Sequence, residues 1–365
     1  MSSTLSQPHP SVMPQPPIPK TMHALVKPAA APGMEMREVP VPTLGPDDVL
    51  IAVETASVCG TDLHIYHWDR WAQNRIKPPY IPGHEFSGTI VSIGERVRNF
   101  SPGDFVSAEM HVACGHCLQC CTGQAHVCQF VKILGVDADG AFADYVRIPA
   151  SNVWKLDPSI PREWGSLFDP FGNAVHTVLA GPIAGQTALV TGCGPIGLFA
   201  IAVAKACGAA RVFAIEPNAG RLALAEQMGA DLLLDPRDPA TEAAVKQATW
   251  NNGVDVLLEM SGHGAAIQQG LRLLRNGGLA GLLGLPSKPV ELDLADAVIF
   301  KGATIHGING RKMYETWLQA EALLRSGRID LSPVITHRLP LADFDKAMHL
   351  LESGEASKIL LQVRR

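Results

Sequence analysis

The chain has 365 residues, which is enough for two domains of ordinary size, each with its own hydrophobic core. Its formal net charge of −5 offers no basic surface of the kind that binds nucleic acid or anionic membranes, so neither is expected as a partner. The sequence contains no apolar run of about eighteen residues or more, so it predicts no membrane-spanning helix.

The N-terminal segment is rich in Pro, Ser and Gln and has no apolar stretch after a basic start. This composition predicts a disordered extension over residues 1–21 and argues against a secretory signal. We therefore expect a cytoplasmic protein. In that compartment, clustered cysteines bind metal or take part in chemistry more often than they form disulfides.

Residues 22 to about 172 contain short apolar or alternating runs separated by Gly and Pro, such as "DDVLIAVETASV" and "SGTIVSIG". Runs of this kind are typical of strands joined by turns. This part of the chain is therefore predicted to be a β-rich, mostly antiparallel and barrel-like domain.

From about residue 185 strand-like and helix-like segments alternate. "QTALVTG" and "RVFAIE" are typical of buried strands, and "PIGLFAIAVAKACG" and "AAIQQGLRLLRNGG" are typical of helices. The alternation predicts βαβ units and a doubly wound parallel sheet. After residue 313 an amphipathic helix and a helix–strand tail are expected to return to the first domain. The predicted organisation is a catalytic domain (22–172 and 315–365) around a nucleotide-binding domain (173–314).

The stretch "TGCGPIG" places Gly192, Gly194 and Gly197 between a predicted strand and a predicted helix. Glycines at this spacing allow a tight turn and the close approach of a pyrophosphate to the helix N-terminus. Glu216 follows the next strand, where a carboxylate can bind ribose hydroxyls and repel the 2′-phosphate of NADP. Arg221 is placed to line the adenine side. A glycine-rich turn in another α/β protein is the alternative, and the acid in this context favours NAD.

Five of the eight cysteines lie within residues 111–128. Four of them have the spacing C-x₂-C-x₂-C-x₇-C, and these are Cys114, Cys117, Cys120 and Cys128. Four thiolates on a short loop suit a closed, tetrahedral structural zinc site. A ferredoxin-type iron–sulfur run would end in C-x₃-C-P, which is absent here. The spare Cys121 is expected to be a bystander.

A second set of metal-binding side chains precedes the cysteine loop. "SVCGTDLH" contains Cys59, Thr61 and His64, and "IPGHEFSG" contains His84 and Glu85. A thiolate, an imidazole and a carboxylate suit a zinc ion that keeps one position open for water or substrate. Either Cys59 or His84 alone would more often be a core residue. Together with the cysteine loop and the nucleotide fold, they favour a catalytic zinc site.

These motifs resemble the zinc-dependent medium-chain dehydrogenase/reductase superfamily over nearly everything after residue 22. Within it, the stretches "FDPFGNAVHT", "FKGATIHGINGRKMYETW" and "DLSPVITHR" resemble the L-threonine 3-dehydrogenase subfamily, and polyol dehydrogenases share parts of the pattern. The resemblance implies an α/β protein with a GroES-like β-rich catalytic domain and a doubly wound parallel Rossmann sheet. It also implies a cytoplasmic homotetramer.

The resemblance implies roles for individual residues. The catalytic zinc would be held by Cys59, His84 and Glu85, and a proton path would run through Thr61 and His64. The residues implied to contact the cofactor are Gly192, Gly194, Ile196, Gly197, Glu216, Arg221, Leu283, Gly284, Leu285, Ile308 and Asn309.

Asp169 is implied to be an acid near the metal, at a position where many relatives have a cysteine. A carboxylate there could bind zinc itself or stay beside it while Glu85 binds, and both arrangements remain open.

The implied reaction oxidises the β-hydroxyl of L-threonine to L-2-amino-3-oxobutanoate, with NAD⁺ as hydride acceptor and two zinc ions per chain. The first alternative is a zinc-dependent polyol or secondary-alcohol dehydrogenase of the sorbitol or butanediol type. Two others are a zinc-ribbon nucleic-acid binder, which the acidic charge disfavours, and an inactive NAD-binding regulatory protein. The intact set of zinc ligands and proton-path residues disfavours the last.

Overall fold

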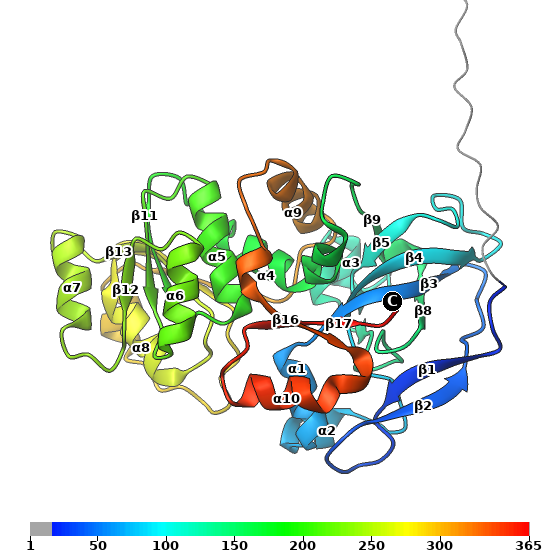
Figure 1. The fold of residues 1–365 in the computed structure, drawn as a ribbon. Helices are drawn as coiled ribbons and strands as arrows, with labels where there is room; N and C mark the ends of the chain where they lie inside the picture. Colours follow the sequence, from blue (N-terminus) through cyan, green and yellow to red (C-terminus); the bar gives the residue numbers. More distant parts are fainter. Residues whose placement is uncertain (1–16, 365) are drawn as a thin grey trace, which may run out of the picture.

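The computed structural model describes residues 17–364. They form two lobes, a β-rich lobe that contains both ends of the described chain and an α/β lobe (Figure 1). Residues 1–16, most of the predicted extension, lie outside the described residues. The first strand, β1 (Thr21–Val26), begins at the end of that predicted extension. None of the described helices has the length and apolar character needed to span a membrane.

The β-rich lobe is built on a seven-stranded sheet in the order β16-β17-β3-β4-β5-β9, with β8 paired to β3. Its longest strand, β3 (Asp48–Ser57), runs antiparallel to β4 (Glu85–Ile93), and side chains such as Phe86 pack in the core of the lobe. β1 pairs with β2 (Glu35–Pro40) beside this sheet. The other strands of the lobe are β5 (Phe105–Ala108), β6 (His111–Val112), β7 (Lys132–Ile133), β8 (Tyr145–Pro149), β9 (Val153–Lys155), β16 (Ile335–Pro340) and β17 (Lys358–Gln362).

The α/β lobe contains a six-stranded parallel sheet in the order β12-β11-β10-β13-β14-β15. Neighbouring residues of its central strand face opposite ways: Val190 packs in one apolar core with helix α5, and Leu189 packs in another with α8. Helices therefore cover both faces, as a buried parallel sheet requires, and the predicted doubly wound sheet is confirmed. Its elements are β10 (Thr187–Thr191), α5 (Pro195–Ala206), β11 (Arg211–Ile215), α6 (Ala219–Gln227), β12 (Leu232–Leu234), α7 (Thr241–Ala248), β13 (Val254–Glu259), α8 (Gly264–Leu273), β14 (Leu274–Leu282) and β15 (Thr304–Gly307).

One predicted helix is shorter than expected. The segment "AAIQQGLRLLRNGG" leaves the helical conformation after Leu273, and β14 begins at the next residue. Gly277 has a φ of 68°, which most side chains disfavour, and the pairing of β13 with β14 shifts register near this point. The glycines at the end of the apolar pattern thus belong to the strand and not to the helix.

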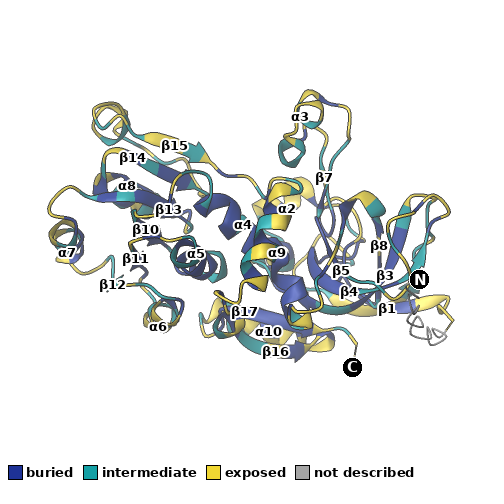
Figure 2. Ribbon diagram, turned by 90° about the horizontal axis from the view of Figure 1, so that it is seen from above, coloured by how far each residue is buried: buried dark blue, intermediate teal, exposed yellow. Residues whose placement is uncertain are grey.

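Helices α4 (Phe168–Val178) and α9 (Glu315–Arg325) lie between the two lobes, and α4 is almost entirely buried (Figure 2). Trp317 of α9 packs in the same apolar core as α5. The predicted boundary between residues 172 and 173 falls inside α4.

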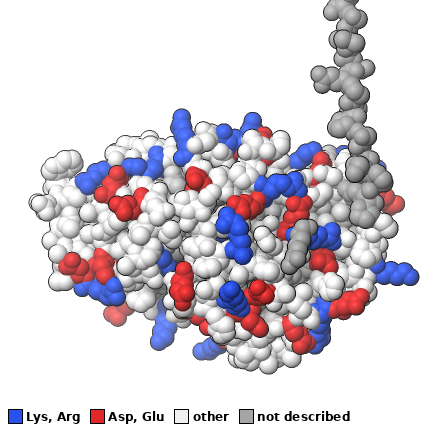
Figure 3. All heavy atoms as spheres, in the orientation of Figure 1, with Lys and Arg blue, Asp and Glu red and all other residues white. Residues whose placement is uncertain are grey.

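The tail helix α10 (Phe344–Glu352) packs against the β-rich lobe, and β17 lies between β16 and β3. The face drawn in Figure 3 carries positive and negative side chains interspersed.

Candidate active site and metal centres

The four cysteines of the C-x₂-C-x₂-C-x₇-C motif come together in the loop between β6 and β7, which includes α3 (Leu118–Cys121). The Sγ atom of Cys117 lies 3.5 Å from that of Cys120 and 3.8 Å from that of Cys128, and Cys114 Sγ lies 4.0 Å from Cys120 Sγ. A tetrahedral zinc with bonds of about 2.3 Å requires sulfur atoms about 3.8 Å apart, so the four thiols fit the metal. None of them is in a disulfide.

Backbone amides favour thiolates in this loop. The amide N–H groups of Cys114 and Phe130 each donate to Cys128 Sγ over 3.3 Å. Backbone N–H groups, first that of Cys120, also lower the pKa of the Cys117 thiol. Cys121 is exposed, and its Sγ donates to the backbone oxygen of His116 over 3.5 Å. It lies outside the four-sulfur group, as predicted for a bystander.

The second predicted metal set is assembled by two neighbouring strands. Cys59 caps α1 (Gly60–His67) just after the end of β3, and His84 and Glu85 lie at the start of β4. Because Ser57 and Glu85 are directly paired across the sheet, Cys59 lies close to His84 and Glu85 although the two segments are far apart in sequence. The Cys59 sulfur and the ligand atoms of the other two residues all lie within 4.8 Å of one another.

The local backbone conformation also helps to position the three ligand residues. Gly83, just before His84, has a φ of 96°, and a Cβ atom there would lie 2.5 Å from the ring of Phe142. A larger residue at this position would move the two ligands on β4. On the other strand, the amide N–H of Cys59 donates to the Asp62 carboxylate over 2.9 Å and fixes the first turn of α1.

The negative charges around the Cys59–His84–Glu85 set favour the binding of a cation. Burial lowers the pKa of His84, but the Cys59 thiolate and the carboxylates of Asp62 and Glu85 outweigh it and raise that pKa to about 10. A metal ion can replace the proton that His84 would otherwise hold. Among the described residues, His84 Nδ1 and Asp62 Oδ1 also have no hydrogen-bond partner although both are buried, which is uncommon in folded proteins. The residues therefore fit a zinc ion with three protein ligands and an open position.

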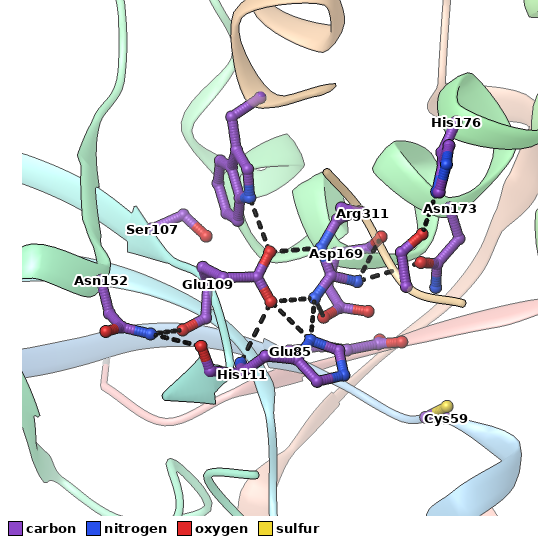
Figure 4. Close-up of polar contacts among 12 residues, drawn as sticks. Cys59, Glu85, Ser107, Glu109, His111, Asn152, Asp169, Asn173, His176 and Arg311 are labelled. Carbon is purple, nitrogen blue, oxygen red and sulfur yellow. Dashed lines mark hydrogen bonds and ion pairs between the residues drawn. The ribbon is translucent and has the colours of Figure 1, made fainter. Parts of the chain in front are cut away.

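Asp169, at the start of α4, is held by a buried guanidinium (Figure 4). Arg311 Nη2 forms an ion pair with Asp169 Oδ2 at 2.8 Å, and Arg311 Nε and Nη2 donate to Glu109 over 2.8 and 2.6 Å. Trp317 Nε1 donates to the same glutamate over 2.8 Å. Burial raises the pKa of Asp169, and Arg311 opposes that shift. Asp169 lies outside the three-residue metal group.

Sequence reasoning missed this network. Arg311 and Glu109 have no exposed side-chain surface, and Gly172 of α4 makes room for them, since a Cβ there would lie 2.5 Å from Arg311 Cδ. Arg311 lies within the stretch "GRKMYETW" that carried the family resemblance, but a single arginine gives no sign of its partners. A glutamate inside the apolar stretch "DFVSAEMHV" was the one available signal.

The proposed proton-path residues lie on α1. Thr61 Oγ1 is 3.8 Å from Cys59 Sγ, beside the metal group. His64 lies in the last turn with 55% of its side chain exposed, and its Nδ1 is 2.6 Å from Asp69 Oδ2. Asp69 also caps α2 (Arg70–Arg75), so the imidazole has a fixed neighbour. The helix thus spans from the metal group to solvent.

The glycine motif lies between β10 and α5, at the carboxyl edge of the sheet where dinucleotides bind in this fold. Gly192 has a φ of 87°, and a Cβ at Gly197 would lie 2.0 Å from the Gly192 oxygen. Gly194 caps α5 and has open space where a Cβ would be. The three glycines therefore provide the turn, the helix–strand packing and the close approach that a pyrophosphate needs.

Glu216 directly follows β11 and is 4% exposed. Its carboxylate accepts hydrogen bonds from the amides of Cys193 and Asn218 over 2.8 and 3.0 Å, so it also braces the glycine loop. Arg221 lies in the first turn of α6, and its buried Nε has no hydrogen-bond partner within residues 17–364. An unpaired buried donor beside this loop is available to a ligand.

The remaining predicted cofactor residues follow β14 and β15 at the same edge of the sheet. The amides of Leu283 and Gly284 both donate to the backbone oxygen of Glu259. Ile308 is 9% exposed, Asn309 is exposed, and the Leu285 side chain is 90% exposed. These residues thus lie at the same edge of the sheet as the glycine loop, and Leu285 is exposed to solvent.

Two family models match the chain: "Alcohol dehydrogenase GroES-like domain" over residues 45–158 and "Zinc-binding dehydrogenase" over residues 195–326. The chain is 51% identical to the L-threonine 3-dehydrogenase of Bacillus licheniformis, covering 93% of this chain and 98% of that protein. It is 50% identical to the protein of the same name from Bacillus subtilis, with coverage of 93% and 98%.

Among solved structures, the 2R,3R-butanediol dehydrogenase of Bacillus subtilis superposes with a TM-score of 0.85 at 28% identity, covering 94% of this chain and all of that one. The fold is thus shared with other alcohol dehydrogenases, whereas the high identity is to threonine dehydrogenases. The chain belongs to the zinc-binding medium-chain dehydrogenases and, within them, to the L-threonine 3-dehydrogenase family.

Proposed function

We propose that the protein oxidises the β-hydroxyl of L-threonine to L-2-amino-3-oxobutanoate, with NAD⁺ as the hydride acceptor. The observation that carries this proposal is the Cys59–His84–Glu85 set, in which His84 and Glu85 are buried, in a chain about half identical to L-threonine 3-dehydrogenases. Incubation with L-threonine and NAD⁺ tests it. NADH should form, and mass spectrometry should find a product that has lost two hydrogens, or its decarboxylated form. Absence of NADH formation would contradict the proposal.

The role of each residue follows from its position in the structure. Bound zinc would polarise the substrate hydroxyl, and bound NAD⁺ would accept the hydride. Cys59, His84 and Glu85 hold the metal. Thr61, 3.8 Å from the Cys59 sulfur, is placed to relay the hydroxyl proton by accepting it as it releases its own, and the exposed His64 passes a proton to solvent. The proton path thus ends at a side chain with access to water.

The ligand set and the domain division are part of the same proposal. Glu85 is the third zinc ligand, and Asp169 stays beside the metal, held by Arg311. Residues 22–172 and 315–365 form the catalytic domain, and residues 173–314 form the NAD-binding domain. The cysteine loop holds the structural zinc.

Cofactor choice gives a direct prediction. Glu216→Gln should narrow the preference for NAD⁺ over NADP⁺ by about tenfold, because it removes a negative charge that repels the 2′-phosphate while keeping the shape of the side chain. The ratio of kcat/KM for the two cofactors measures this. Glu226→Gln, the same change at an exposed position of α6, is the matched control and should leave the ratio unchanged. Equal use of both cofactors by the wild type would contradict the role of Glu216.

A zinc-dependent polyol or secondary-alcohol dehydrogenase is the second candidate. The close superposition with 2R,3R-butanediol dehydrogenase favours it, because the fold is shared over 94% of this chain and all of that one. The lower identity of 28%, against 50% to the threonine enzyme of the same organism, disfavours it.

We propose a homotetramer in the cytoplasm. An open sheet edge at β15 supports assembly, since Ile305 on this strand and the nearby Leu294, Ile299 and Phe300 are exposed apolar side chains. A second copy of the chain could cover this edge, and a monomeric mass by light scattering would contradict the proposal.

The eight cysteines, all free thiols, fit a reducing compartment such as the cytoplasm, and export of the protein from the cell would contradict that location.

A further inference from the structure

A buried lysine contacts the proposed zinc ligand Glu85. Lys358 is 2% exposed and opens β17, the last strand of the chain. Its Nζ forms an ion pair with Glu85 Oε2 and donates to the backbone oxygen of Val58 over 2.8 Å. A buried ammonium without this partner would be strongly unfavourable. The mechanism described above uses Glu85 and gives Lys358 no part.

The topology of the sheet brings the lysine to the glutamate. β3 lies between β17 and β4, Ser57 pairs with Glu85 on one side, and Leu360 pairs with Ser57 on the other. Lys358 therefore reaches past the end of β3 to the start of β4. The hydroxyl of Ser57 contacts the same oxygen of Glu85. All the hydrogen bonds that the described side chains make to this carboxylate go to Oε2.

We propose that Lys358 is a positioning residue for the catalytic metal site. By holding Oε2 of Glu85, it would leave only Oε1 to bind zinc, so the carboxylate would take one coordination position and the position not filled by the three protein ligands would stay open for substrate. Its charge also keeps the loaded site positive after a thiolate and a carboxylate have bound, which favours a developing oxyanion. The inference rests on the proposed role of Glu85 as a ligand.

The second carboxylate of the site has a cation of its own. Arg311 holds Asp169, and Glu109 in turn holds Arg311. Two separate buried cations thus fix the two carboxylates, and only Glu85 lies in the three-residue metal group. Partners of metal ligands commonly change metal affinity or activity about 10–100-fold when removed.

The test uses the full-length protein with Co²⁺ in the catalytic site and zinc in the cysteine loop, since a chelator removes the metal of the open site first. Lys358→Met keeps the length of the side chain and removes its charge and donors. With Oε2 free to bind, the metal should gain a ligand, so the d–d absorption of Co²⁺ should weaken. The kcat should fall about 10–100-fold while the Kd for NAD⁺ stays the same.

Two further variants sharpen the result. Lys358→Arg restores a cation and donors, so it should recover part of the spectrum and of kcat. Lys155→Met makes the same substitution at an exposed ion pair with Asp104 and should resemble the wild type. A wild-type cobalt spectrum and kcat in Lys358→Met would overturn the proposal, because the lysine would then be structural only.

Lys358→Met leaves Glu85 unpaired and could fail to fold. In that case Lys358→Gln replaces the cation with a neutral amide that keeps a hydrogen-bond donor, and a smaller change of the spectrum in the same direction is expected; a wild-type spectrum would overturn the proposal. The cobalt spectrum needs no threonine. A wild-type protein inactive on threonine would reject the proposed function, while a spectral change in Lys358→Met would still support the role of Lys358.

Discussion

Replacing Cys59 with serine is expected to remove the catalytic zinc and the activity together. A serine hydroxyl is not ionised at neutral pH and binds zinc far more weakly than a thiolate, so only His84 and Glu85 would remain. The metal content should fall from two zinc ions per chain to one, because the four-cysteine site is separate. Turnover of L-threonine should fall by more than about a thousandfold, since zinc contributes several kcal/mol to the reaction.

The matched control is Cys121→Ser. This cysteine is exposed and lies beside the structural site, but its sulfur is not part of the metal group. The variant should keep both zinc ions and full activity. Two zinc ions in Cys59→Ser, or a loss of zinc in Cys121→Ser, would contradict the assignment of the two sites.

The second large effect is expected at His64. His64→Ala should lower kcat about 10²–10⁴-fold, or about 3–5 kcal/mol of barrier, because the proton loses its acceptor on the way to solvent. Zinc content and the Kd for NAD⁺ should stay at wild-type values, since the side chain is 55% exposed and contacts Asp69 outside the metal group. Measurement of all three quantities separates a lost proton path from a lost metal.

His67 provides the control on the same helix. It lies one turn further along α1 with 50% of its side chain exposed, and it forms an ion pair with Glu352. His67→Ala should therefore keep kcat near the wild-type value, and added imidazole should restore part of the activity of His64→Ala only. Normal turnover by His64→Ala would exclude the proton path.

Features that depend on local spacing could be predicted from the sequence. The four cysteines of the loop and the glycines from Gly192 to Gly197 lie close together in the chain, so their spacing nearly determines their geometry. The Cys59 and His84 segments were also recognisable, because each carries its own short motif. The predicted helix ran past the observed end of α8 at Leu273, because the apolar pattern continues into the strand that follows.

The charged partners of the site could not be predicted in the same way. Arg311 is 202 positions from Glu109, and Lys358 is 273 positions from Glu85. Each is a single charged residue in an ordinary sequence, and only the paired strands and the buried helix α4 bring the partners together. The choice between Glu85 and Asp169 as third ligand depends on these partners, so the sequence left it open.

The most direct test of threonine oxidation at this site is the rate of NADH formation from a panel of alcohols. L-Threonine, sorbitol, 2,3-butanediol and L-serine should be compared at equal concentrations with NAD⁺, and zinc should be measured in the same sample. Threonine oxidation at this site predicts the highest kcat/KM for L-threonine and a much lower value for L-serine, a primary alcohol that lacks the γ-methyl group. A higher kcat/KM for sorbitol or 2,3-butanediol would contradict it.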